Sequence, residues 1–196
     1  MSPSPRNDAV LEQLIELYLD QGFASFGVGD LAAHLRCSRS TLYAIATSKE
    51  QLILTAVRGY FRRATERIEA RVADEPDEGL RLRVYLAAVS DELAPAGERF
   101  FADLSAYAPA QEVYEQNTRQ AAQRVQDLVA AGVEAGRLRP INARFVGAAV
   151  AEVMSAIQIG RLEAATGIKD ADAYAELADL VHRAVALTPH PGPMVH

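Results

Sequence analysis

The sequence predicts an all-α protein, and three observations carry that prediction. Alanine is abundant, no stretch alternates apolar and polar residues as a half-buried strand would, and glycine and proline fall mainly between segments of helical spacing. The 196 residues are enough for one large or two small domains. The contents of 49% hydrophobic and 23% charged residues are typical of a globular chain.

Four helices are expected in the first part of the chain, over about residues 8–21, 28–35, 39–45 and 48–73. Asn7 can cap the first helix, and Gly22 suits the left-handed residue that ends it. Ser48 and Gln51 have the spacing of a capping box at the start of the fourth helix.

Five further helices follow a charged break at residues 74–79, over about 80–94, 96–107, 110–135, 142–165 and 170–188. Asn142 begins the fourth of these, and Asp170 is expected to cap the last. About nine helices therefore make up the chain. Both ends are rich in proline, and we expect residues 189–196 to form a flexible tail.

Several classes of protein are excluded by composition and by missing motifs. No apolar run reaches 18 residues, and the N-terminal MSPSPRND lacks the apolar segment of a signal peptide, so we expect a cytoplasmic protein with no membrane partner. Cys37 is the single cysteine, and the four histidines lack the spacing of metal ligands. No nucleophile or phosphate-loop motif is present. We therefore expect no metal, no cofactor and no enzyme activity.

Residues 28–46, VGDLAAHLRCSRSTLYAIA, have the layout of a helix-turn-helix, with a tight turn at Arg36-Cys37 and a second short helix capped by Ser38. In such a unit the start of the second helix reaches base edges in the DNA major groove. The side chains there are Ser38, Arg39, Ser40 and Thr41, all of which form hydrogen bonds. Tyr43 and Lys49 follow, at positions from which they can reach phosphates.

From Val10 to about Val57 the sequence resembles the TetR (tetracycline-repressor) family of bacterial transcription regulators. The resemblance covers LYLDQGF at residues 17–23, VGDLA at 28–32, SRSTLY at 38–43 and SKEQL at 48–52. It implies an all-helical homodimer with an N-terminal DNA-binding domain and a C-terminal domain for effector binding and dimerisation. It also implies a repressor that leaves a palindromic double-stranded operator when a small molecule binds.

Three positions depart from the family pattern. Gly27 replaces a Ser or Thr cap, Arg36 replaces the usual turn glycine, and Ile45-Ala46 replaces an aromatic or histidine pair. Arg36 adds a candidate phosphate contact. Residues 28–50 carry a net charge of +1 and residues 74–196 a net charge of −7, which favours DNA contact through the N-terminal part alone.

The C-terminal half offers candidate residues for an effector pocket. They are apolar or aromatic side chains at helical spacing together with one amide: Tyr85, Phe100, Phe101, Leu104, Tyr107, Tyr114, Leu128, Met154, Ile157 and Gln158. Such a stripe is more often ordinary core than a ligand pocket. As a pocket it favours an apolar or amphipathic small molecule.

The helix expected at 143–165 is apolar nearly all round, which predicts burial on both sides. We expect a partner subunit to cover the second side, because Gly147, Ala151 and Ser155 form a row of small residues. Tyr174, Leu177 and Val181 on the last helix would complete a four-helix interface of a homodimer.

The predicted domains are a helix-turn-helix domain at 5–66 and an effector-binding and dimerisation domain at 67–188. The predicted function is a ligand-responsive transcriptional regulator, a repressor. The alternative is an all-helical dimeric ligand-binding protein whose DNA recognition has degenerated, because of the departures at Gly27, Arg36 and Ile45-Ala46.

Overall fold

The computed structural model describes the backbone of residues 5–187, with all side chains in that range except those of residues 5, 170 and 171. The all-α prediction is confirmed: this part of the chain forms ten helices and one isolated β-bridge. The helices are α1 (Pro5–Gln21), α2 (Val28–His34), α3 (Arg39–Ile45), α4 (Lys49–Ala73), α5 (Glu78–Leu93), α6 (Glu98–Ala106), α7 (Ala108–Glu134), α8 (Ala143–Gln158), α9 (Arg161–Thr166) and α10 (Asp170–Val185). The tail predicted at residues 189–196 lies outside the described residues.

Two of the predicted helix starts are wrong by a few residues. The first helix begins at Pro5, so Asn7 lies inside it and does not cap it. A proline is compatible with the first position of a helix, because the N–H that it lacks has no partner there. The last helix has Lys169 at its N-cap, one residue before the predicted Asp170.

The single helix predicted over 142–165 is also wrong, because the structure divides it into α8 and α9. Asn142 caps α8 as predicted, and its side chain accepts a hydrogen bond from the Phe145 N–H at 3.0 Å. The break falls at Gly160, which has a φ of 68°. Glycine adopts this left-handed conformation without a steric penalty, so it ends a helix more readily than it continues one.

The chain forms two compact units. The first contains the described residues up to Arg67 together with Asp91–Asn117, and the second contains Ile68–Ser90 and the described residues from Thr118 onward. Helices α4 and α7 each contribute to both units. The assignment of DNA binding to 5–66 and of effector binding to 67–188 remains a prediction.

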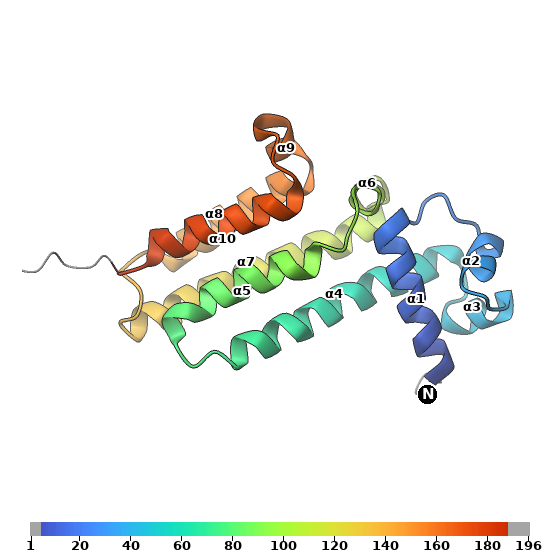
Figure 1. Cartoon of the computed structure of the whole chain (residues 1–196), viewed down its shortest axis with the longest axis horizontal. Coiled ribbons are helices and arrows are strands. Elements are labelled where there is room, and N and C mark those ends of the chain that lie inside the picture. The colour runs from blue at the N-terminus through green and yellow to red at the C-terminus, as the bar shows by residue number, and fades with distance from the viewer. Residues whose placement is uncertain (1–4, 188–196) are drawn as a thin grey trace, which may run out of the picture. The chain divides into compact units, whose positions relative to one another are not determined.

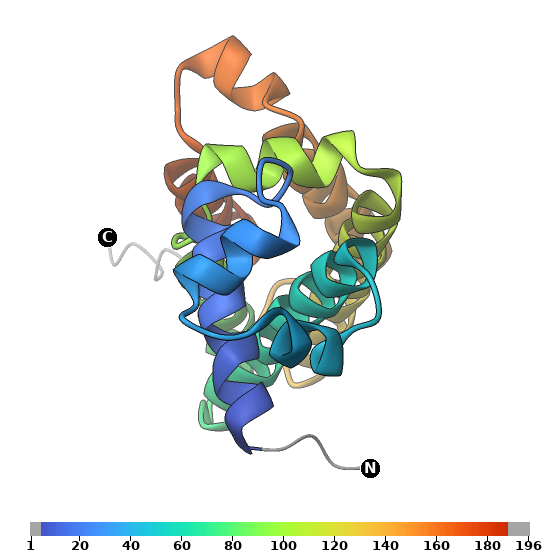
Figure 2. The same ribbon diagram turned by 90° about the vertical axis from the view of Figure 1, so that its right-hand side faces the viewer.

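In the first unit, α3 packs against both α1 and α2 (Figures 1 and 2). The core consists of apolar side chains from α1 to α4, from α6 and from the start of α7, including the fully buried Leu14, Leu31, Leu42 and Leu52. Leu42 is the buried residue of α3 and anchors the helix, Ile45 packs against the core beside it, and Arg39, Ser40, Tyr43 and Ala44 are exposed.

In the second unit, α8 and α10 lie side by side (Figure 1). The β-bridge joins Leu138 to Ala186, and the Arg139 N–H donates to the Val185 carbonyl at 3.0 Å. On α7, Arg124 forms two hydrogen bonds of 2.8 and 2.9 Å with the carboxylate of Glu69. Backbone pairing and a bidentate ion pair thus join segments of this unit that are far apart in the sequence.

Across residues 5–187, no helix combines the length and the apolar character that a membrane span requires. The same part of the chain holds no group of three His, Cys, Asp or Glu side chains placed to bind a metal ion.

Candidate nucleic-acid interface

The turn between α2 and α3 is a Schellman motif with an arginine in the position that usually holds glycine. The N–H of Cys37 donates to the Ala32 carbonyl at 3.0 Å, and the N–H of Arg36 donates to the Ala33 carbonyl at 3.3 Å. Arg36 has a φ of 48° and is the only non-glycine residue with a positive φ among those described. Its side chain is exposed. The turn therefore keeps the backbone geometry that glycine favours and adds a cation to its surface.

Ser38 caps α3. Its hydroxyl oxygen accepts a hydrogen bond from the Thr41 N–H at 3.1 Å and lies 2.6 Å from the Ser40 hydroxyl and 2.9 Å from the Thr41 hydroxyl. The three hydroxyls thus form one cluster at the start of the helix. Ser38 has a structural task here, because it satisfies a backbone donor that the helix leaves open. Ser40 remains exposed.

Arg39 and Tyr43 point away from the core. Both are exposed, and the guanidinium of Arg39 has no hydrogen bond or ion pair with any residue that the structure describes. Lys49 differs from them, since its ammonium group donates to the Ala24 carbonyl at 3.1 Å. Lys49 therefore fixes the loop before α2, and its remaining donors can still reach a phosphate.

Asp103 on α6 forms contacts that no motif in the sequence indicates. One oxygen of its carboxylate accepts hydrogen bonds from the N–H groups of Phe23 and Ala24, at 2.6 and 2.8 Å. The Gly97 N–H, at the start of α6, donates to the Leu19 carbonyl of α1 at 2.8 Å. Helix α6 therefore belongs with α1, α2 and α3 in one compact unit. No local sequence pattern predicts these contacts, because the partners are about 80 residues apart in the chain.

Gly22 ends α1 as predicted, with a φ of 75°. A Cβ at this position would also lie 2.5 Å from the Asp103 carboxylate and 3.2 Å from the Arg99 carbonyl. Glycine is thus required twice, for its backbone conformation and for the close approach of α6.

Cys37 is half-buried against the core of the first unit. Burial raises the pKa of its thiol, and the opposing charge of Arg6 does not reverse the shift. The thiolate form is disfavoured, which fits the interpretation of Cys37 as a small packing residue.

The ten candidate effector residues are divided between the two units. Five lie in the first unit, where Phe100, Phe101, Leu104 and Tyr114 belong to the core and Tyr107 packs against it. The ring centroids of Phe23 and Phe100 lie 6.2 Å apart, and those of Phe61 and Tyr114 lie 5.5 Å apart. These rings pack against α1 and α4 as ordinary core does.

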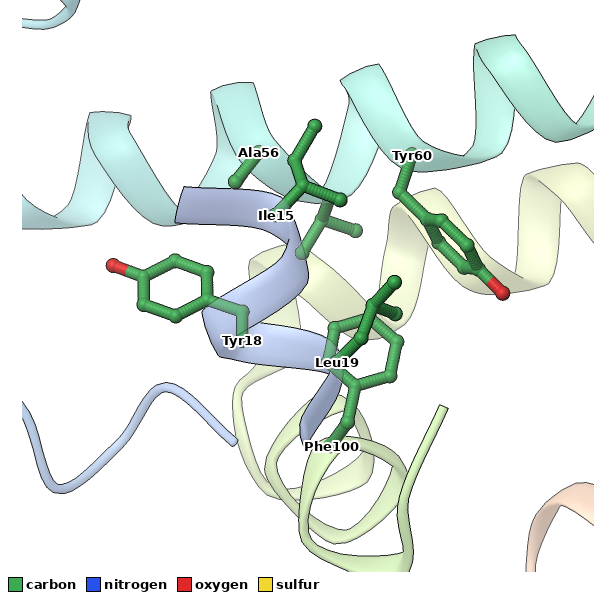
Figure 3. A pocket seen from close by; sticks show the side chains of 7 residues that line it. Ile15, Tyr18, Leu19, Ala56, Tyr60 and Phe100 are labelled. Carbon is green, nitrogen blue, oxygen red and sulfur yellow. The ribbon is translucent and has the colours of Figure 1, made fainter. Parts of the chain in front are cut away.

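Side chains of α1, α4 and α6 in the first unit also line a small apolar gap, which is too small to hold a water molecule (Figure 3). Of the ten candidates only Phe100 lines it. Tyr18 contributes its ring, while its hydroxyl is buried without a hydrogen-bond partner among the described residues. The Tyr60 hydroxyl donates to the Glu92 carbonyl at 2.7 Å. The gap therefore has no room for an effector.

The other five candidates lie in the second unit: Tyr85, Leu128, Met154, Ile157 and Gln158. All but Gln158 are buried. The Gln158 amide donates to the Thr118 hydroxyl at 3.0 Å and to the Tyr174 hydroxyl at 3.3 Å, which joins α7, α8 and α10. Burial and the charge of Glu69 raise the pKa of the Tyr85 phenol, which therefore stays protonated.

Most of the predicted dimer-interface residues lie inside the chain. Tyr174, Leu177 and Val181 are buried within the second unit. Gly147 is buried too, and a Cβ there would overlap the Gln126 side chain of α7. Ala151 is half-buried, and Ser155 is exposed.

The outward faces of α8 and α10 carry other residues. Phe145 is 71% exposed and Ile159 63%, and on α10 Leu180 is 65% exposed. Ala148 and Ala149 are also exposed on α8. Single exposed apolar residues are common, but several large ones on two adjacent helices mark a surface that a partner can cover.

The fold is shared with solved transcription regulators. A regulator from Saccharomonospora viridis, in complex with choline, has a TM-score of 0.74 at 17% identity, covering 95% of this chain and 100% of that one. A TetR-family regulator from Agrobacterium tumefaciens has a TM-score of 0.71 at 17% identity, with the same coverage. The chain has the TetR fold.

The fatty acid degradation regulator FadR from Bacillus halodurans shares this TetR fold, with a TM-score of 0.67 at 12% identity over 100% of both chains. No protein-family profile and no curated protein matches the chain. The likeness to these solved structures is thus one of fold, at 12–17% identity.

Proposed function

We propose that the protein is a TetR-type transcriptional regulator that binds double-stranded DNA as a homodimer. The observation that carries the proposal is the exposed start of α3, where Arg39 and Ser40 point outward beside the cation of Arg36. Arg39 has no partner in the described part of the chain, so its five donors are available to bases.

The side chains divide into two roles on the DNA. Arg39, Ser40 and Thr41 would contact base edges, because they start the recognition helix. Arg36, Tyr43 and Lys49 would contact phosphates and set the register. Ser38 would contribute chiefly through the helix cap.

We place the dimer interface on the outward faces of α8 and α10, around Phe145, Ile159 and Leu180. This keeps the helices of the original prediction and moves the interface to side chains that are free in one chain. Ala151 and Ser155 remain candidates at its edge. Burying this apolar surface would contribute about 25 cal/mol per Å².

We assign effector binding to the interior of the second unit. Tyr85, Leu128, Met154 and Ile157 supply an apolar surface, and Gln158 supplies a polar partner, which favours an apolar or amphipathic small molecule. A ligand that co-purifies with the protein would be detected by native mass spectrometry, and Gln158→Leu should weaken its retention.

Release of the operator would follow from coupling between effector binding in the second unit and DNA binding in the first. Helix α4 continues from the first unit into the second, and α6 is hydrogen-bonded to the loop before α2. An effector that binds more tightly to a different arrangement of α4 and α6 would shift the protein toward that arrangement. The recognition helices of the dimer would then no longer match the spacing of about 34 Å between half-sites.

DNA binding is tested by selection from a random duplex library with the full-length chain, followed by fluorescence anisotropy at two salt concentrations. We expect an enriched palindromic sequence, and an affinity for it that Arg39→Ala lowers by about 1–3 kcal/mol. If no sequence is enriched and the chain still dimerises and binds small molecules, the ligand-binding alternative is correct.

A further inference from the structure

Gly29 lies inside α2 without a conformational reason to be glycine. It is not one of the residues with a positive φ, and its helix is regular from Val28 to His34. Gly29 is the second residue of α2 and lies in its first turn, where glycine still loses more backbone freedom on folding than any other residue would. The reason for a glycine here must therefore lie in what surrounds it.

What surrounds it is the guanidinium of Arg39. The three atoms nearest to an added Cβ at Gly29 all belong to that group: Nη2 at 2.8 Å, Cζ at 3.6 Å and Nε at 3.7 Å. A Cβ contact of 2.8 Å is too close, so any side chain at this position would displace the guanidinium. Arg39 can move, because the contact is at the far end of a flexible side chain.

This contact matters because no hydrogen bond or ion pair with the described residues restrains the Arg39 side chain. It is exposed and forms no hydrogen bond or ion pair with the described residues. A free arginine samples many rotamers and loses that freedom when it binds. A guanidinium that already rests against a helix backbone keeps all its donors and loses less freedom on meeting a base.

We propose that Gly29 is a positioning residue for Arg39. Because Gly29 has no Cβ, it leaves a space on the surface of α2, here called the seat, in which the Arg39 guanidinium is held for base recognition. The inference rests on the proposed function of α3 as a recognition helix. It assigns to α2 a share in sequence specificity without any DNA contact of its own.

The test compares wild type, Gly29→Ala, Arg39→Ala and the double variant, all as full-length chains. Each is measured by anisotropy on the duplex selected by the wild type and on an unrelated duplex of equal length. We expect Gly29→Ala to weaken binding to the selected duplex by about tenfold, within the range of one bidentate base contact. Binding to the unrelated duplex should change by less than about twofold, because the charge is kept.

Three controls separate positioning from a structural effect. Alanine is the better helix residue, so the thermal midpoint of Gly29→Ala should be equal to or above that of wild type. In the Arg39→Ala background, Gly29→Ala should change affinity by less than about twofold. In the free protein, NMR should show cross-peaks between the Gly29 Hα and Arg39 Hδ protons.

The outcomes are distinct. The inference would be overturned if Gly29→Ala bound the selected duplex as tightly as wild type does. It would also be overturned if Gly29→Ala lowered the affinity equally in the wild-type and Arg39→Ala backgrounds. Missing NMR cross-peaks would overturn it without any DNA measurement. If no duplex is selected, the proposed function fails while the NMR result still decides whether the seat exists.

Discussion

Arg36 offers a sharp test, because one side chain combines a conformational cost with a functional charge. It occupies the left-handed position of a Schellman motif, with a φ of 48°. For a residue with a Cβ this conformation costs roughly 1–2 kcal/mol. Glycine avoids that cost but loses about 0.5–1 kcal/mol through its greater freedom in the unfolded chain. Arg36→Gly should therefore stabilise the folded protein by about 0.5–1 kcal/mol.

The same change removes a cation from the turn that we propose lies against DNA. The DNA-binding constant falls as the salt concentration rises, and each phosphate contact makes this dependence steeper. If Arg36 contacts one phosphate, the slope of log K against log salt concentration should become less steep by about 0.9 per half-site in Arg36→Gly. Stability is measured by urea unfolding followed by circular dichroism, and affinity by anisotropy from low to moderate salt. Stability should rise while DNA affinity falls.

Two matched variants separate the effect of the backbone strain at position 36 from the effect of the positive charge. Arg36→Lys keeps both the strain and the charge, so it should match wild type in stability and in salt slope. Arg36→Asn tolerates the left-handed conformation and lacks the charge, so it should follow the glycine variant in salt slope. The reasoning is refuted if Arg36→Gly is no more stable than Arg36→Lys, or if all variants share one salt slope.

Three further predictions follow from the contacts described. Asp103→Ala removes the acceptor of two backbone N–H groups and should lower the free energy of unfolding by about 1–2 kcal/mol, whereas Asp103→Asn, which keeps an oxygen, should cost less in the same urea titration. Lys49→Met should weaken binding to all DNA sequences alike and lower the salt slope, and a loss confined to the selected duplex would contradict a phosphate contact. Phe145→Glu should convert the dimer to a monomer in size-exclusion chromatography with light scattering, while Leu80→Glu, on α5, should leave the dimer intact; a dimeric Phe145→Glu would place the interface elsewhere.

The sequence by itself determined the features that depend on neighbours within a turn or two. The bounds of α3, the Ser38 and Asn142 caps and the left-handed Gly22 were all predictable, because each involves residues at most a few positions apart. The same locality explains the error at Gly160. By its spacing, a glycine inside an apolar run is compatible with a continuous helix, although glycine is also the commonest residue just beyond a helix end.

Only the tertiary structure decided which face of each helix is covered. A helix that is apolar all round does not specify which side meets its own chain, so Gly147 and Leu177 were assigned to a partner although the chain buries them itself. The contacts of Asp103 and the seat of Arg39 on Gly29 likewise join separate elements. Their energies depend on how helices pack, and packing is set by the shape of the whole core rather than by any local pattern.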